Sequence, residues 1–300
     1  MLLEQRARQG HGGKVNVEHG KWKVSEKIAR AFGPAVFATI LAAASAGPSA
    51  QWVSYPTAGV PRTSTGSADL HARPPRMIDG TPDLSGIWEP EQTRPCPPGG
   101  CADMPVGEQF IDLGWGLPGG LPYQPWAAEL VKRRKAADGK DDPISQCLPI
   151  GVPRIHALPL PRKIVQIPGL IVVLSEQNVA YRQIFTDGRP LPVDPQPSWN
   201  GYSVAKWDGD VLIVRTSGFR DEIWLDRAGS PMTDAANVTE RLRRVDFGTL
   251  EVEITVDDPK AYTRPWTVKL RHFLVLDTEL LDYVCLENER DVEHLNVTRK

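Results

Sequence analysis

The sequence has almost no excess of charge of either sign. Its 300 residues include 35 Lys and Arg against 37 Asp and Glu, a formal net charge of −2. Proteins that bind nucleic acid usually carry a basic patch or stripe, so this balance argues against nucleic acid as a partner. Charged residues make up 24% of the chain and hydrophobic residues 41%. That composition excludes a disordered chain, which would be more charged and less apolar.

The motifs of several large enzyme classes are also lacking. No Gly-x-Ser-x-Gly elbow, Walker loop or His-Glu-x-x-His motif occurs. The chain has four cysteines, and they form no Cys-x-x-Cys pair. The sequence therefore predicts no metal site and no cofactor.

The first fifty residues predict a leader with a signal peptide. Residues 31–50 carry no charge and follow a basic stretch. Their apolar run, 35–44, is shorter than the about 20 residues that span a bilayer. Small residues before Ala46 and Ala50 fit a signal-peptidase site, so we expect cleavage near one of them and a periplasmic or secreted protein. The signal peptide covers about 24–50, and a start at Val24 would leave residues 1–23 untranslated.

Cleavage would remove seven basic and three acidic residues, which changes the net charge from −2 to −6. No later segment predicts a transmembrane helix. Residues 51–82 are rich in Pro, Ser, Thr and Gly and predict a linker. Residues 83–296 then form one domain, which includes a loop and helix arm at 91–162.

The abundance of proline and glycine, 28 and 26 residues, disfavours long helices and favours short strands joined by turns. One helix is predicted at Pro125–Ala137, which begins with Pro and ends in basic residues. Alternation of period two follows from Lys163 onward. The predicted strands are Gly86–Glu89, Lys163–Ile167, Leu170–Glu176, Val179–Thr186, Tyr202–Trp207, Val211–Ser217, Asn237–Asp246, Thr249–Val256, Trp266–Leu276 and Glu279–Cys285.

Turns such as Asp208-Gly209 and Phe247-Gly248 separate several of these strands, as in β-hairpins. Consecutive hairpins give an antiparallel meander, and about ten strands tend to curl and close. We therefore predict an all-β fold, an antiparallel up-and-down barrel with a Pro/Gly-rich N-terminal arm and one short helix. A two-sheet β-sandwich is the alternative.

The four cysteines, Cys96, Cys101, Cys147 and Cys285, suit two disulfides in an exported chain. Three pairings are open. The bent loop between Cys96 and Cys101 can close on itself, which would leave Cys147 to pair with Cys285.

Two resemblances add to this interpretation. Gly86-Ile87-Trp88 in the first strand resembles the Gly-x-Trp of lipocalin-like (calycin) barrels, whose Trp packs at the closed end beneath a ligand cavity. Most of the chain from Pro82 to Leu295 is similar to a widespread group of exported bacterial proteins of unknown function. The matching stretches are PDLSGIW, LPYQPWAAELVK, GKDDP, CLPIGVPR, YRQIFTDGRPLP, GYSVAKWDGD, VTERLRR, DDPKAYTRPWTV and YVCLENERD. Members often have Gly-x-Pro-His where this chain has Gly229-Ser230-Pro231-Met232, so any role of that His in relatives is absent here or transferred to another residue.

Polar residues on apolar strand faces are the first candidate functional groups. Alternation places Glu240 and His272 inside the barrel, and it puts Tyr181 and Gln183 on one face with Val179. Glu240 and His272 could act as base and acid, with burial raising the pKa of the carboxyl, while Tyr181 or Arg264 orients a substrate and Gln183 contacts a ligand. The alternative is a set of hydrogen-bonded buried side chains that stabilise the fold.

Loops at a barrel mouth supply the second group of candidates. The predicted ligand contacts are the stacking residues Trp199, Tyr202, Trp224 and Tyr262, and the polar residues Asp221, Asp226 and Arg264. The alternative is that these residues serve turn geometry.

Three functions are compatible with the sequence. The first is an exported barrel that binds a small apolar or aromatic molecule in an internal pocket. The second is a cofactor-independent hydrolase, lyase or isomerase that uses the interior Glu and His. The third is a structural or interaction protein of the cell envelope. The sequence predicts no oligomeric state.

Overall fold

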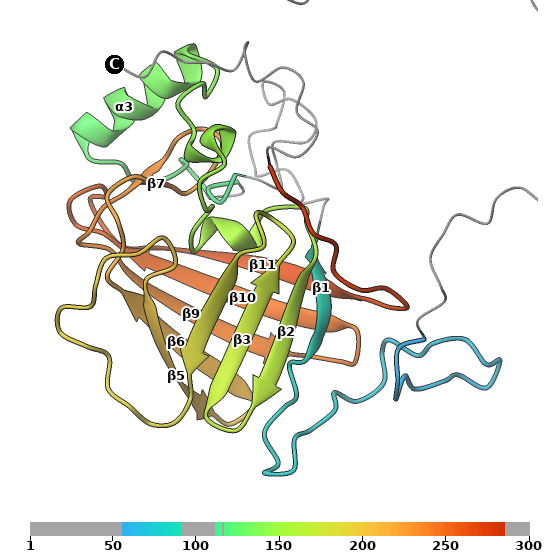
Figure 1. Cartoon of the computed structure of the whole chain (residues 1–300). Coiled ribbons are helices and arrows are strands. Elements are labelled where there is room, and N and C mark those ends of the chain that lie inside the picture. The colour runs from blue at the N-terminus through green and yellow to red at the C-terminus, as the bar shows by residue number, and fades with distance from the viewer. Residues whose placement is uncertain (1–55, 92–111, 116, 286–300) are drawn as a thin grey trace, which may run out of the picture. The chain divides into compact units, whose positions relative to one another are not determined.

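The computed structural model describes residues 56–91, 112–115 and 117–285, which belong to one compact unit, Ser54–Lys300 (Figure 1). The predicted leader and the predicted Cys96–Cys101 pair lie outside the described residues.

Nine strands close into a barrel, so the barrel prediction is confirmed and the sandwich alternative is wrong. Around the barrel the order is β1-β11-β10-β9-β6-β5-β4-β3-β2. The strands are β1 Gly86–Pro90, β2 Arg162–Ile167, β3 Leu170–Ser175, β4 Tyr181–Phe185, β5 Tyr202–Asp208, β6 Val211–Ser217, β9 Asn237–Arg244, β10 Thr249–Asp257 and β11 Trp266–Val275. Two short strands, β7 Ile223–Trp224 and β8 Pro231–Met232, pair with each other outside the barrel.

The barrel differs from the prediction in two ways. β4 and β5 are parallel, with Ile184 opposite Ser203, so the sheet is mixed rather than antiparallel. Parallel neighbours need a crossover, and residues 186–201 provide it in place of a hairpin. The predicted strand Glu279–Cys285 is also wrong, because only Tyr283 of this segment makes a bridge, to Gln177.

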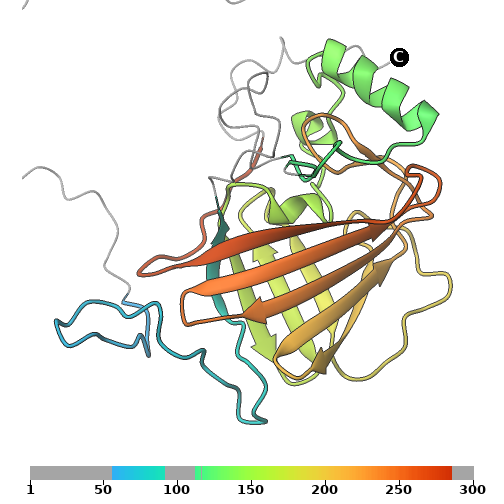
Figure 2. The same cartoon turned by 180° about the vertical axis from the view of Figure 1, so that it is seen from behind.

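The predicted helix is confirmed as α3, Pro125–Ala136, which has Pro at its first position and basic residues in its last turn. Two 3₁₀ turns follow, η1 at Pro143–Gln146 and η2 at Arg154–His156. Both views of the fold place the segment 125–156 beyond one end of the barrel (Figures 1 and 2). No helix in the described part of the chain is both long and apolar enough to span a bilayer.

Inward-facing aliphatic side chains form one continuous cluster inside the barrel, because alternate residues of each strand point to the axis. Its members include Ile164, Ile171, Ile184, Leu212, Leu242, Val252 and Leu270. Trp88 is fully buried in this cluster, and its indole donates a hydrogen bond to the Leu84 carbonyl at 3.0 Å. The guanidinium of Arg244 lies 4.9 Å from the ring centroid of Trp88 and donates to the Asp83 carbonyl at 2.7 Å. Arg244 therefore ties the start of β1 to the end of β9.

The face assignment of β4 is a correction. Tyr181 is 64% exposed and Gln183 is also exposed, whereas Arg182 and Ile184 are buried. An alternating strand reverses all its side chains when the assignment is wrong by one residue. Tyr181 and Gln183 therefore point away from the barrel interior and do not join Glu240 and His272.

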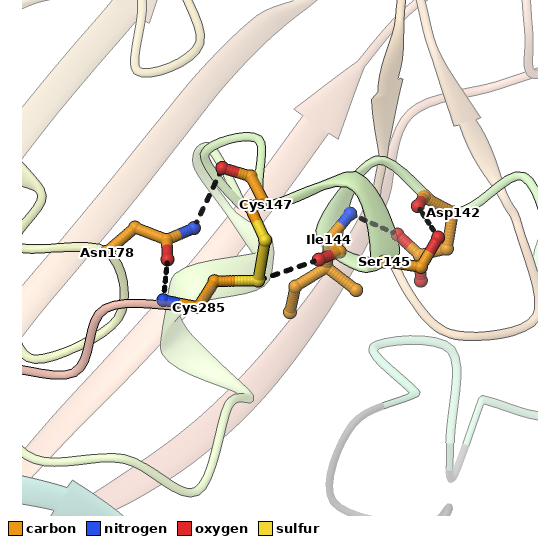
Figure 3. Close-up of a disulfide and its surroundings, with 6 residues drawn as sticks. All are labelled: Asp142, Ile144, Ser145, Cys147, Asn178 and Cys285. Carbon is orange, nitrogen blue, oxygen red and sulfur yellow. Dashed lines mark hydrogen bonds between the residues drawn. A yellow bond between two sulfur atoms is a disulfide. The ribbon is translucent and has the colours of Figure 1, made fainter. Parts of the chain in front are cut away.

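The predicted pairing of Cys147 with Cys285 is confirmed (Figure 3). The side chain of Asn178 also connects Cys147 and Cys285, through hydrogen bonds to their backbones. Its side-chain amide donates to the Cys147 carbonyl at 3.1 Å, and its side-chain oxygen accepts the Cys285 N–H at 3.3 Å. The segment after β11 is thus attached to the loop that follows η1.

Candidate functional site

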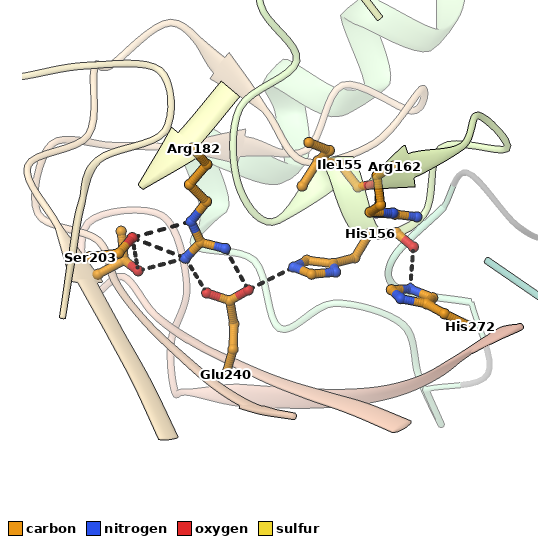
Figure 4. Close-up of polar contacts among 8 residues, drawn as sticks. Ile155, His156, Arg162, Arg182, Ser203, Glu240 and His272 are labelled. Carbon is orange, nitrogen blue, oxygen red and sulfur yellow. Dashed lines mark hydrogen bonds and ion pairs between the residues drawn. The ribbon is translucent and has the colours of Figure 1, made fainter. Parts of the chain in front are cut away.

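A buried polar cluster lies where η2 meets the barrel (Figure 4). Arg182 from β4, Glu240 from β9 and His272 from β11 point inward, and His156 comes from η2. Glu240 and His272 therefore face inward, as alternation predicts. All four side chains are almost fully buried, so each polar atom needs a partner inside the protein.

Arg182 and Glu240 form a two-pronged ion pair. One guanidinium nitrogen of Arg182 donates to Glu240 Oε1 at 2.9 Å, and Nη2 donates to Oε2. The hydroxyl of Ser203 accepts from Arg182 Nε at 3.2 Å, and that of Thr216 accepts from Nη2 at 3.0 Å. Every nitrogen of this guanidinium has a partner, which is what a buried charge requires.

The state of Glu240 differs from the sequence-based expectation. Burial by itself would raise the pKa of this carboxyl, but the charge of Arg182 and the hydrogen bonds from Arg182 and His156 outweigh it. The pKa of Glu240 is therefore held well below its usual range, and the group stays a carboxylate. A permanently ionised, fully bonded carboxylate is a poor general base.

His156 is the imidazole that contacts Glu240. Its Nε2 lies 2.6 Å from Glu240 Oε1, and because a carboxylate only accepts hydrogen bonds, Nε2 must carry the proton. Burial lowers the pKa of His156 more than Glu240 raises it, so the ring is neutral and Nδ1 is a bare acceptor. Nδ1 is buried and has no hydrogen-bond partner among the residues that the structure describes. Sequence reasoning missed His156 because the segment around η2 has no apolar periodicity that would single it out.

His272 does not contact Glu240 as predicted. Its Nε2 donates instead to the backbone carbonyl of His156 at 3.1 Å, and the two rings stack with centroids 5.4 Å apart. Burial, and then the charge of Arg162, hold the pKa of His272 well below its usual range. Both histidines are therefore neutral at physiological pH.

Arg162 differs from the other buried arginines. Asp142 neutralises Arg154 through two contacts of 2.7 Å, Glu240 neutralises Arg182, and Arg244 donates to backbone carbonyls. Arg162 is only 2% exposed, yet within the described ranges Nη1 alone is bonded, to the Ile155 carbonyl, while Nε and Nη2 have no partner there. No carboxylate in the described part of the chain pairs with it.

The charges of this cluster do not cancel. Arg182 and Glu240 offset each other, both histidines are neutral, and Arg162 keeps its positive charge. Burial lowers the pKa of Arg162 to about 9, and Glu89 opposes this shift from a longer distance. The site thus has one buried cation with unused donors, next to one imidazole with an unused acceptor.

Several of the predicted ligand-contacting residues in the loops are less exposed than a ligand contact requires. Trp224, Tyr262 and Asp226 are buried, Trp199 and Tyr202 are half-buried, and Asp221 and Arg264 are exposed. Arg134 covers the Trp224 ring at 4.2 Å, and the Tyr262 hydroxyl donates to the Pro231 carbonyl at 2.8 Å. Trp224 and Tyr262 therefore pack inside the protein instead of offering open stacking surfaces.

Among the pockets lined by described residues, two lie on the outside of the protein. One is lined by the charged outer face of β9, β10 and β11, with Arg241, Glu253 and Lys269 among its residues, and the other lies against Phe273 and Leu70. Neither includes a residue that the sequence predicts as functional. Among the described residues no three His, Cys, Asp or Glu side chains gather as a metal site would require.

Asp226 is fully buried and interacts with the half-buried Asp112. Asp226 accepts hydrogen bonds from the Ser230 N–H at 3.0 Å and from the Ser230 hydroxyl at 2.5 Å. Burial and then the negative charge of Asp226 raise the pKa of Asp112 to about 7, against the opposing effects of the Gly114 N–H and Lys135. Asp112 therefore binds a proton in the folded state at a pH where an ordinary carboxyl is ionised.

This shift predicts a pH-dependent stability. The unfolded chain releases the Asp112 proton near pH 4, and the folded protein holds it up to about pH 7. The free energy of unfolding should therefore fall as the pH rises through this window, at up to about 1.4 kcal/mol per pH unit. Urea unfolding from pH 4 to 8 measures it.

In the Asp112→Asn variant this slope should be absent, since the amide does not titrate. Asp221→Asn changes an exposed carboxyl and is the matched control. If the wild type and Asp112→Asn have parallel stability profiles, the shifted pKa of Asp112 is wrong.

Comparison with known protein families and with curated proteins finds no match for this chain.

Proposed function

We propose that the protein binds a small organic anion at the end of the barrel that η2 covers. The observation that carries the proposal is the unpaired, buried guanidinium of Arg162. A buried cation without a counter-ion costs several kcal/mol. A ligand with a carboxylate would supply that counter-ion and accept from Nε and Nη2, because a guanidinium matches the two oxygens of a carboxylate.

The proposal modifies the expectation of an apolar ligand in the centre of the barrel. Aliphatic side chains form a continuous cluster inside the barrel, so we place the ligand at the end that holds the buried polar cluster. An apolar or aromatic body remains compatible with this site, since Trp88 is the cross-strand neighbour of Arg162. The anionic group is the part of the ligand that Arg162 would recognise.

Replacing Arg162 with Met should weaken binding and stabilise the free protein at the same time. Loss of a charge-assisted contact of about 1.5–3 kcal/mol weakens affinity about 10- to 100-fold. Removal of an uncompensated buried charge should raise the free energy of unfolding by about 1–3 kcal/mol. Titration calorimetry with benzoate and thermal unfolding measure the two effects.

Arg182→Met is the matched control. Both substitutions remove a buried arginine, but Arg182→Met leaves the Glu240 carboxylate unpaired and should lower the melting temperature. If Arg162→Met destabilises the protein as Arg182→Met does, and benzoate affinity does not change, the proposed site is wrong.

A second candidate function, a cofactor-independent enzyme, is favoured by one contact. Glu240 orients the neutral imidazole of His156 and leaves Nδ1 free, the arrangement of a carboxylate-oriented general base. In this version His156 replaces Glu240 as the base, and His272 positions the His156 backbone. Tyr181 takes no part, because it points outward.

We also propose that the protein is exported and related to lipocalin-like barrels, as its resemblances imply. The uncharged segment 31–50 and the disulfide Cys147–Cys285 support export. The full burial of Trp88 in the apolar cluster of the barrel supports the relationship to lipocalin-like barrels. Sequencing of the N-terminus of the secreted protein tests export, since cleavage should expose a new terminus near Gly47 or Gln51.

A further inference from the structure

The second unused polar atom of the site, His156 Nδ1, restricts the ligand further. Arg162 can only donate hydrogen bonds, and the bare Nδ1 of His156 can only accept them. A ligand that is anionic and otherwise apolar would satisfy the first group and leave the second unpaired. Because Nδ1 is already buried and unpaired in the free protein, a ligand that also donates a hydrogen bond to it gains a contact that an otherwise apolar anion cannot make.

The Arg162 guanidinium and the His156 ring are connected by a continuous set of hydrogen bonds. Arg162 Nη1 donates to the carbonyl of Ile155, and the next residue is His156, whose own carbonyl accepts from His272. Glu240 holds the other edge of the His156 ring, and Arg182 fixes Glu240. Figure 4 shows His156 between Glu240 on one side and Arg162 with His272 on the other. Neither group can turn to another partner without breaking these bonds.

We infer that the ligand is a hydroxy acid, whose carboxylate binds Arg162 and whose hydroxyl donates to His156 Nδ1. This inference rests on the proposed function, because it assumes that a ligand occupies the site. It assigns a role to the ion pair of Arg182 and Glu240, which acts as a positioning device. The pair keeps the His156 proton on Nε2, and Nδ1 is therefore always an acceptor.

The test compares benzoate with 2-, 3- and 4-hydroxybenzoate and with the three methoxybenzoates, by titration calorimetry on the full-length protein. The three isomers sample three separations between carboxylate and hydroxyl. At least one hydroxybenzoate should bind about tenfold or more tightly than benzoate. Its methoxy counterpart, which has no proton to donate, should lose that gain.

Nitrogen NMR of His156 gives a second readout that does not depend on a variant folding. We expect a neutral ring protonated on Nε2. The Nδ1 resonance should move toward that of a protonated nitrogen on addition of the preferred hydroxybenzoate, and it should stay in place with benzoate. A merely structural histidine would show no such difference.

The outcomes separate the inference from the proposal beneath it. If benzoate and the hydroxybenzoates bind equally well through Arg162 and the Nδ1 resonance does not move, the inference is overturned while the proposed function stands. If none of the acids binds in an Arg162-dependent way, both are overturned. A proton on Nδ1 in the free protein would also overturn the inference.

Discussion

Replacing Glu240 with Gln is expected to lower the free energy of unfolding by about 3–5 kcal/mol. For a domain of this size the melting temperature should fall by roughly 6–20 °C. The amide keeps the shape of the side chain and can still accept the His156 Nε2 proton. What the substitution removes is the negative charge, and it leaves Arg182 buried with no counter-ion.

Glu253→Gln is the matched control for this experiment. Glu253 lies on the outer face of β10, 3.0 Å from Lys269 and partly exposed to solvent. Exposed ion pairs contribute little, so its loss should change stability by about 0.5 kcal/mol or less. The double variant Arg182→Met/Glu240→Leu removes both charges and should recover at least half of the loss caused by Glu240→Gln.

Circular dichroism and urea unfolding measure these differences. Equal stability of Glu240→Gln and Glu253→Gln would show that the Arg182–Glu240 pair does not balance a buried charge. The expected loss also bears on an enzymatic role for Glu240. A drop in activity of Glu240→Gln, if activity is found, would have to be separated from partial unfolding.

Local sequence patterns predicted the hairpins, whereas the pairing of β4 with β5 depends on contacts between residues that are distant in the sequence. β2 with β3, β5 with β6, and β9 with β10 join through short turns, whose residues are visible in the sequence. The parallel pairing of β4 with β5 depends on where residues 186–201 carry the chain, and no short-range pattern encodes that path. The alternation of apolar residues therefore could not predict that the barrel contains both parallel and antiparallel pairs.

The inward face of β4 shows the same limit. Tyr181, Gln183 and Phe185 look more apolar together than Arg182 and Ile184 do, so the pattern favours the wrong face. Arg182 can be buried because Glu240 lies opposite, 58 residues later in the chain. Burial of a charge depends on a partner that the local sequence does not contain.

His156 and Arg162 could not be predicted as site residues from the sequence, for a related reason. Glu240 and His272 interrupt the apolar faces of their strands, so the two-residue alternation of the sequence identifies them. His156 follows a turn at Pro153, in a segment with no period, and it reaches Glu240 across 84 residues. Arg162 immediately precedes the predicted strand at Lys163, where an arginine is ordinary. Its importance lies in the partners that Nε and Nη2 lack, which only the structure shows.

Replacing Cys147 and Cys285 with Ser is expected to lower stability by about 5 kcal/mol in the chain-entropy treatment of a disulfide. The bridge joins residues 138 positions apart, and a cross-link over so long a loop removes many conformations of the unfolded chain. The side chains of Asn178 and Glu176 also hold the segment after β11, since they accept from Cys285 and Leu281. The folded structure of the variant should therefore persist, and the loss should come mainly from the unfolded state.

The experiment is best done in a Cys96→Ser/Cys101→Ser background, so that any effect of reductant belongs to Cys147 and Cys285. Dithiothreitol should lower the melting temperature of that protein by roughly 10–20 °C and leave the variant with all four Ser unchanged. Free energies of unfolding by urea should agree with this difference. If the reduced and oxidised proteins unfold at the same temperature, the bridge fastens only the segment after β11 and does not constrain the barrel. The barrel would then owe its stability to its aliphatic interior and to the paired charges at its end.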